Sequence, residues 1–344
     1  VKTTKTENSA VVPHIVNNKA LKESEVVKKK IDDASNEKAV VSQETTQDSI
    51  DADAEKDSKK RKESINKVCQ RLETINVLEP PADRKDRKKK LQRFNLLHHI
   101  IVNEKHKVLY CFMPKVGCSN MKRIFLVMEG LYPSVEKVDI KKMNREIVRL
   151  ENNKFNEEQR KYMLNNFYKF MIVRDPFERL VSGFRNKWQN KRNTELHTHL
   201  GKRIVEKYRY NNTRTVETGD DVTFTEYARY LIDSRSWEVN EHWMPYEELC
   251  RPCNVNYDFV GSIDTLQRDV KHAMRQIHAN ETKYHLIHMK GAQPLVQAKR
   301  TTAEFLKQLP RKYFDQLLKV YETDHKLFNY RLPDFETLDK RYPA

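Results

Sequence analysis

The chain has 344 residues, of which 38% are hydrophobic and 33% are charged, and its formal net charge at pH 7 is +16. No stretch approaches the roughly 18 consecutive apolar residues of a membrane-spanning helix, and five cysteines are too few for a disulfide scaffold of this length. This composition argues against a polytopic membrane protein and against a small disulfide-rich domain. The positive charge favours polyanionic partners such as phosphorylated cofactors, acidic glycans, anionic membrane or nucleic acid.

Two regions of different composition follow one another along the chain. Residues 1–60 contain no Phe, Tyr or Trp and are rich in Lys, Glu, Asp, Ser and Thr, so they cannot bury enough apolar surface to offset chain entropy. They predict a disordered stem or linker, which leaves residues 61–344 as one folded domain. A helical pattern begins near Ser64, and Pro80-Pro81 and the basic run over residues 84–93 interrupt it.

The folded region shows the order strand, tight turn, helix twice. Residues 107–113 are an apolar run typical of a strand, and after a loop over residues 114–118 one helix face carries Met121, Ile124, Phe125 and Met128. Residues 170–173 are a second apolar run, and the helix face after it carries Phe177, Leu180, Val181, Phe184 and Trp188. The pattern predicts an α/β fold, in which a P-loop-like parallel sheet is flanked by helices and binds ligands at the carboxyl ends of its strands.

The C-terminal half contains further predicted elements and one polar insertion. The insertion covers residues 190–222 and is predicted to be irregular. The predicted elements are a short helix opened by a capping box at residues 223–226, a strand over residues 257–261, a helix over residues 265–277, and a helix from Pro310 toward Leu327.

The first junction has the residues of an anion site. Gly117 is the first of only seven glycines, and it stands where the strand turns into the helix, a place that needs a positive φ or a close backbone approach. Ser119 and Asn120 add polar groups beside the helix N-terminus, which itself attracts anions. The Walker A pattern is not matched, because Lys115 precedes the glycine. Lys115, Lys122 and Arg123 supply positive charge to this site. The structural alternative is an ordinary strand-to-helix turn with a solvated basic rim.

The second junction combines a helix cap with basic and hydroxyl side chains. Asp175 and Pro176 suit the N-cap and the first helical position, and Glu178 stands at capping-box spacing. Arg174 ends an apolar strand and is expected to point into the crevice above the sheet. Together with Arg179 and Ser182, which we expect on the helix face opposite the core, it would suit a phosphate monoester. The alternative is a salt bridge from Arg174 to Asp175 or Glu178.

These residues resemble a known family, the Golgi carbohydrate sulfotransferases of the chondroitin 4-O-sulfotransferase and HNK-1 sulfotransferase group. Residues 114–120 with Lys122 and Arg123 look like that group's 5′-phosphosulfate loop, and residues 173–182 are similar to its 3′-phosphate motif. Further matches are Asn240-Glu241-His242-Trp243, Cys250-x-Pro252-Cys253, the strand 256–261, and the C-terminal residues Tyr321, Asp324, Leu327, Phe328 and Tyr330. Met121 departs from the Trp that is usual in the group, and Met244 departs from a common basic residue.

The resemblance implies a sulfotransferase catalytic domain over residues 61–344 that uses 3′-phosphoadenylyl sulfate (PAPS) as the sulfate donor and no metal. The 5′-phosphosulfate side would be bound by Pro114, Lys115, Val116, Gly117, Cys118, Ser119 and Asn120. The 3′-phosphate side would be bound by Arg174, Asp175, Pro176, Phe177, Glu178, Arg179 and Ser182. Lys115 is the expected catalytic group at the bridging oxygen, where negative charge develops. His242 is the first candidate for the general base and Glu241 the second, with His106, His197 and His199 as alternatives.

The resemblance also implies an acceptor and a cellular location. The expected acceptor is the 4-hydroxyl of N-acetylgalactosamine in chondroitin or dermatan on a proteoglycan, and the alternative is the 3-hydroxyl of a terminal glucuronic acid. The expected location is the Golgi lumen in type II topology, with a membrane signal-anchor that we expect outside the given sequence and no nucleic-acid partner. The sequons at Asn211 and Asn280 permit a glycoprotein.

Other classes explain part of the sequence. A non-enzymatic binder of heparin-like glycans or RNA would explain the basic charge but not the two junctions. A nucleotide kinase would require a lysine after the glycine and a carboxylate for magnesium. Cys250 and Cys253 lack a second pair at zinc-ligand spacing, so a local disulfide is the better interpretation. Cys69, Cys111 and Cys118 would then supply one more bridge and one free thiol.

Overall fold

The computed structural model describes residues 48–70, 96–190, 193–209, 218–233, 240–280, 282–287 and 294–343. The chain divides into two units, residues 1–52 and residues 53–344, and the described residues of the first unit are helical. Several predicted features lie outside the described residues, namely the stem over residues 1–47, Pro80-Pro81, the basic run 84–93 and the sequon at Asn211. The second unit contains the sheet and the helices around it.

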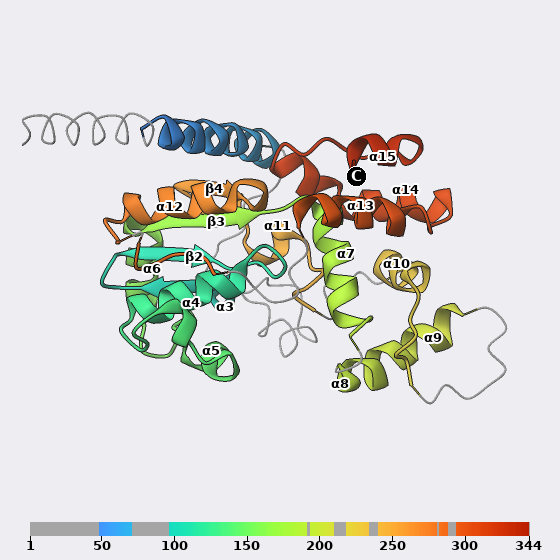
Figure 1. Ribbon diagram of the computed structural model, residues 1–344, viewed down its shortest axis with the longest axis horizontal. Coiled ribbons are helices and arrows are strands. Elements are labelled where there is room, and N and C mark those ends of the chain that lie inside the picture. Colours follow the sequence, from blue (N-terminus) through green and yellow to red (C-terminus); the bar gives the residue numbers. More distant parts are fainter. Residues whose placement is uncertain are drawn as a thin grey trace, which may run out of the picture. The chain divides into compact units, whose positions relative to one another are not determined.

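The centre of the second unit is a four-stranded sheet in the order β1-β2-β3-β4 (Figure 1). β2 (Val108–Cys111), β3 (Tyr168–Val173) and β4 (Phe259–Ser262) run parallel, which confirms the predicted parallel core of an α/β fold. β1 (Ile100–Asn103) pairs antiparallel with β2 and was not predicted, so the sheet is mixed. The two parallel neighbours of β3 bring the carboxyl ends of three strands to one edge.

Helices flank the sheet and form a second layer of packing beyond it. Figure 1 shows α7 (Pro176–Lys187) leading from the end of β3 toward a group of helices further along the chain. Besides α7 and a helix near the start of the described residues, the structure contains α3 (Leu96–His99), α4 (Cys118–Met128), α5 (Ile140–Glu146), α6 (Glu157–Asn166), α8 (Thr194–Leu196), α9 (Lys202–Tyr208), α10 (Phe224–Asp233), α11 (Tyr246–Leu249), α12 (Leu266–Gln276), α13 (Leu295–Leu306), α14 (Arg311–Leu327) and α15 (Leu338–Arg341). Short single turns are η2 (Val135–Lys137), a π-helical turn η3 (His197–Gly201), η4 (Ile263–Thr265) and η5 (Phe335–Thr337).

The prediction that residues 190–222 are irregular was wrong for residues 194–208. Residues from Thr194 to Tyr208 are helical, because Leu200, Ile204 and Val205 recur at helical spacing and bury their side chains. Charged residues between these apolar positions hide the pattern in the sequence.

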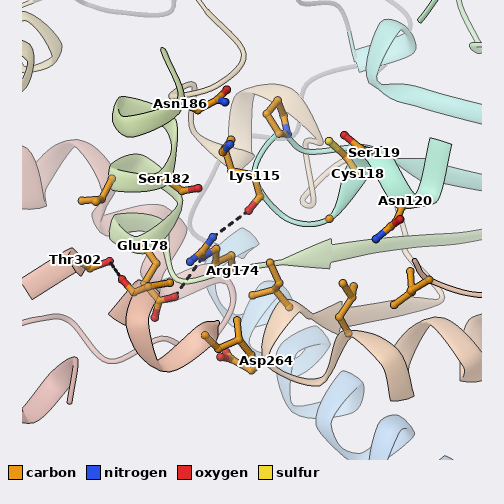
Figure 2. Close-up of a pocket in the computed structure, with 18 of the residues that line it drawn as sticks. Lys115, Cys118, Ser119, Asn120, Arg174, Glu178, Ser182, Asn186, Asp264 and Thr302 are labelled. Atoms are coloured by element: carbon orange, nitrogen blue, oxygen red, sulfur yellow. Dashed lines mark hydrogen bonds and ion pairs between the residues drawn. The ribbon is translucent and has the colours of Figure 1, made fainter. Parts of the chain in front are cut away.

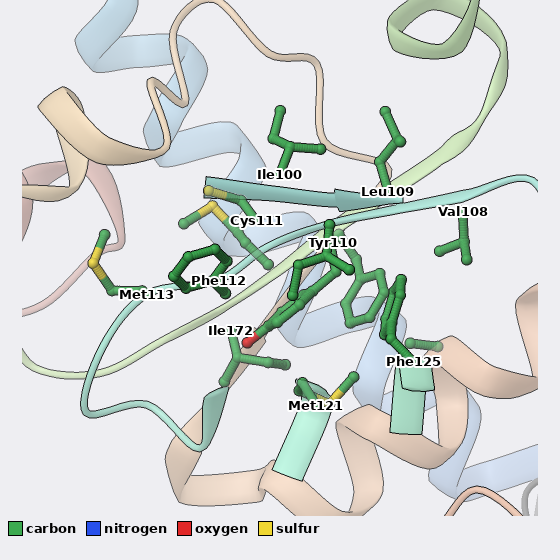
Figure 3. Close-up of a cluster of buried hydrophobic side chains, with 14 of the residues drawn as sticks. Ile100, Val108, Leu109, Tyr110, Cys111, Phe112, Met113, Met121, Phe125 and Ile172 are labelled. Carbon is green, nitrogen blue, oxygen red and sulfur yellow. The ribbon is translucent and has the colours of Figure 1, made fainter. Parts of the chain in front are cut away.

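Two hydrophobic clusters hold the unit together. The first surrounds the sheet, where the centre of the Tyr110 ring lies 6.0 Å from that of the Phe125 ring on α4 (Figure 3). The centre of the Phe170 ring on β3 lies 4.9 Å from that of Tyr110. The second packs α7 against α10 and α14, with Phe184 and Tyr227 near its centre. The apolar face predicted for the helix after residue 173 therefore belongs to this second cluster.

A helix over residues 53–69 covers the outer edge of β4. The hydroxyl of Ser58 accepts a hydrogen bond from the backbone N–H of Val260 at 2.9 Å, and the Arg61 guanidinium donates to the Val260 carbonyl at 3.0 Å. The helix thus provides hydrogen-bond partners for backbone groups of an edge strand that would otherwise be exposed. It starts before Ser64 and includes residues expected in the stem, because the small side chains of Ala54 and Ser58 are buried one helical turn apart.

Two disulfides and one free thiol account for the five cysteines, as predicted in number. The predicted pairing was wrong, because Cys250 bonds to Cys111 on β2 and Cys253 bonds to Cys69 at the end of the 53–69 helix. Closeness in sequence favoured a local bridge, whereas the turn after α11 directs the two cysteines to different elements. Cys118 remains unpaired.

Candidate functional site

A cleft of about 980 Å³ opens at the carboxyl ends of β2, β3 and β4 (Figure 2). This is the edge of the sheet at which the sequence predicts a ligand site. The predicted residues that line the cleft are Pro114, Lys115, Gly117, Cys118, Ser119, Asn120, Arg174, Glu178, Ser182 and His242. The structure therefore brings both junctions and the Asn-Glu-His-Trp element to one cavity. Val116, Asp175, Pro176, Phe177 and Arg179 are buried and do not line it.

The first loop turns from β2 into α4 through two left-handed residues. Lys115 has φ of 74° and Gly117 has φ of 85°. A Cβ atom on Gly117 would meet the Leu266 side chain at 3.0 Å, so this glycine serves both the positive φ and a close approach. A lysine in the left-handed region is strained, and such strain is concentrated at functional sites.

The N-terminus of α4 is open toward ligands. Among the described residues, no side chain caps the N-terminus of α4 at Gly117, and the first turn of α4 carries no acidic residue. Ser119 lines the cleft at this end, so the positive end of the helix dipole and a hydroxyl lie together. The Asn120 side chain donates to the Ile287 carbonyl at 3.0 Å, while its buried oxygen lacks a partner within the described residues.

The N-terminus of α7 is closed by its own cap. The Asp175 carboxylate accepts from the N–H groups of Phe177 at 2.9 Å and Glu178 at 3.1 Å. It also accepts from the Arg341 guanidinium at 2.7 Å and from the Tyr342 hydroxyl at 3.1 Å. Asp175 is the predicted N-cap, and its carboxylate is fully engaged inside the protein. Any anion at this junction must therefore be held by side chains.

Arg174 is the buried cation of the second junction. Its Nε lies 3.2 Å from the Glu178 carboxylate, and its Nη1 donates to the Lys115 carbonyl at 3.3 Å (Figure 2). The predicted position above the sheet and the alternative salt bridge to Glu178 are thus both present. Burial raises the pKa of Glu178 to about 7, although the charge of Arg174 acts in the opposite direction.

Arg179 and Ser182 do not share a ligand-facing side of α7, contrary to the expectation. Ser182 lines the cleft, but Arg179 is fully buried and donates to the backbone carbonyls of Met244 and His242. Its guanidinium also lies 4.8 Å from the centre of the Tyr246 ring. The segment after residue 240 packs on α7 and satisfies this arginine, and the sequence of α7 alone does not show that packing.

Lys115 and Lys122 differ in their access to the cleft. Lys115 lines it, and burial together with neighbouring positive charges such as Arg174 lowers its pKa to about 8. Lys122 is buried behind the loop, where its ammonium donates to the Asn144 side chain at 3.0 Å and lies 3.8 Å from the centre of the Phe112 ring. Lys122, which was expected to add positive charge to the anion site, therefore does not line the cleft.

His242 is the candidate base that reaches the cleft. Its Nδ1 lies 2.6 Å from the side-chain oxygen of Asn240, which also accepts the backbone N–H of His242 at 3.0 Å. An amide oxygen can only accept, so Nδ1 carries the ring proton and Nε2 is left as a proton acceptor. Burial, with the charges of Lys187 and Lys115, lowers the pKa of His242 to about 2, so the ring is neutral at physiological pH. The other candidates, His106, His197, His199 and Glu241, do not line the cleft.

The wall of the cleft opposite the two loops was not predicted. It comes from residues 263–268 after β4, from Leu286 and Ile287, and from α13 through Leu295, Ala298, Thr301 and Thr302. The residues after β4 could have been found from the predicted strand over residues 257–261, since the carboxyl ends of parallel strands share an edge. No motif in the sequence indicated that α13 would form part of this wall.

Two further features concern metals and membranes. Within the described ranges, no group of three or more His, Cys, Asp and Glu side chains is arranged to hold a metal ion. Among the helices of those ranges, none has both the length and the apolar character that a membrane crossing requires.

Comparison with known proteins gives a consistent result. Residues 98–331 match the model of the sulfotransferase family. The chain is 37% identical over 252 residues to carbohydrate sulfotransferase 14 of Danio rerio, a match that covers 72% of this chain and 66% of the relative. It is 34% identical to carbohydrate sulfotransferase 11 of Rattus norvegicus, with 74% and 73% covered, and 38% identical to carbohydrate sulfotransferase 14 of Homo sapiens, with 71% and 63% covered. No solved structure matched the chain.

Proposed function

This chain belongs to the sulfotransferase family, and we propose that it is an enzyme that transfers sulfate from PAPS to a hydroxyl group of a carbohydrate. One observation carries the proposal. The cleft at the strand ends unites an open helix N-terminus, a buried arginine, a lysine and a neutral histidine, namely Ser119, Arg174, Lys115 and His242. This set can bind two anionic groups and accept one proton.

The residues present fit the chemistry of the donor. The loop from Gly117 to Ser119 would hold the 5′-phosphate with backbone N–H groups and a hydroxyl. Arg174 and Ser182 would hold the 3′-phosphate. The apolar wall suits an adenine ring, and the unpartnered oxygen of Asn120 suits its amino group better than a phosphate, because it can only accept. The wall residues in question are Leu266, Leu286, Ile287 and Leu295.

The proposed chemistry divides between Lys115 and His242. PAPS, when bound, supplies a sulfuryl group attached to a phosphate leaving group. The Lys115 ammonium would stabilise the negative charge that develops on the leaving oxygen, and its buried position strengthens that interaction. The Nε2 atom of His242 would accept the proton of the sugar hydroxyl, while Asn240 holds the ring through Nδ1.

The low pKa of His242 is compatible with this role once an anion occupies the cleft. Besides burial, the positive charges that lower it are those of Lys187, Lys115, Arg179 and Lys122. An anionic ligand beside Lys115 offsets part of this field and makes the imidazole a stronger base. His242 would then be most basic when the donor side is filled.

We place the acceptor among acidic glycans of the chondroitin and dermatan type, with the 4-hydroxyl of N-acetylgalactosamine as the first choice. The net charge of +16 and the carbohydrate sulfotransferases among the relatives support an acidic glycan. A terminal glucuronic acid remains the alternative acceptor. The two disulfides support an oxidising compartment such as the Golgi lumen.

The decisive experiment is transfer of labelled sulfate from PAPS to desulfated chondroitin, dermatan and glucuronyl-terminated oligosaccharides, followed by disaccharide analysis. We expect 4-sulfated N-acetylgalactosamine from the wild type and a loss of at least about a hundredfold in turnover for Lys115→Ala. Circular dichroism and thermal melting should show that the variant stays folded. Unchanged turnover of Lys115→Ala would remove the catalytic assignment.

Binding without turnover separates the rival classes. We expect the protein to bind adenosine 3′,5′-bisphosphate in competition with PAPS but not with ATP and magnesium, which a nucleotide kinase would prefer. A polyanion binder would show no saturable nucleotide site. For the base, His242→Ala should lose the acidic limb of the pH–rate profile, and wild-type activity of that variant would exclude His242.

A further inference from the structure

Three basic side chains lie within electrostatic reach of Glu241, the residue before His242, but outside the lining of the cleft. They are Lys122 on α4, Arg149 in the turn after α5, and Lys187 at the end of α7, and we call them the cation cluster. The proposed donor site does not use them. They are therefore candidates for binding a second ligand, distinct from the sulfate donor.

A buried ring fixes two members of the cluster. The Lys122 ammonium lies 3.8 Å and the Arg149 guanidinium 5.9 Å from the centre of the Phe112 ring. The His99 ring packs on the same phenylalanine at 4.6 Å. Phe112 is 1% exposed, so the two cations are held on a rigid platform and lose little freedom when a ligand binds.

A single carboxylate, that of Glu241, stands near all three cations. It lies 3.7 Å from Nε2 of His99 and 4.0 Å from Nδ1 of His242, which places the cluster next to the proposed base. Burial lowers the pKa of Lys122, Arg149 and Lys187, and the charge of Glu241 acts in the opposite direction on each of them.

Among the residues that the structure describes, no carboxylate forms an ion pair with Arg149 or Lys187. Within the described ranges, the buried Nε atom of Arg149 has no hydrogen-bond partner. Glu241 acts on all three cations and Glu151 acts on Arg149 as well, so two carboxylates face three cations, and an excess of positive charge is partly removed from water. An anionic group from outside would compensate it.

We propose that the cation cluster binds the carboxylate of a hexuronic acid unit in the acceptor glycan, next to the sugar that receives sulfate. This inference rests on the proposed function. Arg149 offers a planar fork that matches a carboxylate, and Lys187 adds a mobile charge. Glu241 lies 4.0 Å from Nδ1 of His242, the nitrogen that also contacts Asn240, so a carboxylate bound at the cluster would keep the acceptor chain beside this histidine.

The test pairs two acceptors that differ in one group. One is desulfated chondroitin, and the other is the same polymer after its uronic carboxylates have been reduced to primary alcohols. For Arg149→Gln and Lys187→Gln we expect the KM for chondroitin to rise about tenfold per variant, with kcat largely retained. The KM for the reduced polymer should stay within about twofold, since the group that the cluster recognises is absent.

Lys319→Gln on α14 is the matched control, because it removes one exposed lysine from another face and should change neither KM. Calorimetry with adenosine 3′,5′-bisphosphate should give the wild-type Kd for all three variants. A changed nucleotide Kd would assign the cluster to the donor side, and an equal rise in KM for both polymers would show a non-specific effect of charge. Either result overturns the proposal.

Measuring acceptor binding tests the cation cluster even if no sulfate is transferred. Calorimetry with a chondroitin hexasaccharide should show weaker binding to Arg149→Gln and Lys187→Gln than to the wild type. If the wild type transfers no sulfate to any polymer, the proposed function fails, and equal hexasaccharide affinities would then refute the cluster separately.

Discussion

At the scale of single residues, Glu178 is the unusual member of the candidate site, because it is an acid in a cleft proposed to bind anions. It pairs with Arg174 at 3.2 Å, and its pKa is raised to about 7 by burial. Below this pKa the side chain is mostly neutral and leaves Arg174 available to a ligand. Above it the carboxylate competes with a phosphate for the same guanidinium.

We therefore predict a pH-dependent difference between the wild type and Glu178→Gln. Between pH 6 and pH 8 the ratio of the wild-type Kd to the variant Kd for adenosine 3′,5′-bisphosphate should increase, by up to about tenfold. Titration of Lys115 and of the phosphate contributes equally to both proteins, so the ratio isolates Glu178. Isothermal calorimetry at several pH values measures it, and a constant ratio would contradict the prediction.

The same shift has a consequence for stability. The pKa of Glu178 is raised above its unfolded value, so the stability it contributes is present below about pH 4.5 and is lost as pH rises through about 7. Glu178→Gln cannot ionise and escapes this loss. The free energy of unfolding of the variant relative to the wild type should increase from pH 5 to pH 8 in denaturant titrations.

Gly117 can be tested against another glycine of the same conformation. Gly117 and Gly130 have φ of 85° and 79°, but a Cβ atom added to each would have a neighbour within 4 Å only at Gly117, where it meets the Leu266 side chain. We expect each change to Ala to cost about 1 kcal/mol of unfolding free energy from the left-handed backbone. Gly117→Ala should also weaken nucleotide binding at least about tenfold, whereas Gly130→Ala should not. Equal affinities of the two variants would show that the loop does not contact the nucleotide.

At the scale of elements, the sequence predicted those segments whose apolar pattern is long and uninterrupted. β3 and α7 are examples, because a fully buried strand is followed by an Asp-Pro cap that starts the helix. β1 was missed because its four residues follow directly on α3 and offer no alternation. Arg179 was misplaced for a different reason: its partners, Met244 and Tyr246, come from a distant segment.

The 53–69 helix is an element whose attachment can be measured. The bridge between Cys69 and Cys253 closes a long segment of chain, and removing such a cross-link raises the entropy of the unfolded state. We predict that Cys69→Ser with Cys253→Ser lowers the unfolding free energy by about 2–4 kcal/mol in guanidinium titrations. Cys118→Ser, which breaks no bridge, should change it by less than about 0.5 kcal/mol. Equal stabilities of the double variant and the wild type would mean that the bridge adds nothing.

At the scale of the whole molecule, the cleft is assembled from segments that are far apart in the sequence. Motifs identified the two junctions, since each is contiguous and each follows a strong strand signal. The third wall, from residues 263–268 to Thr302, depends on how β4 and α13 pack against those junctions. The cation cluster depends on how α4, the turn after α5 and the end of α7 come together. Local patterns therefore indicate the residues of the proposed donor site, whereas the proposed acceptor site depends on tertiary packing that the sequence does not show.

The net charge of +16 leads to a last prediction, on the response to salt. Exposed charges are screened over about 10 Å at 0.1 M ionic strength, so attraction of a polyanionic acceptor weakens as salt increases. Between about 50 and 500 mM NaCl we expect the KM for desulfated chondroitin to rise by about tenfold or more, while kcat changes little. The carboxyl-reduced polymer has no charge for the field to act on, and its KM should stay nearly constant. A similar response of both polymers would mean that salt acts on the protein itself, and that its basic surface is not what draws the acceptor to the cleft.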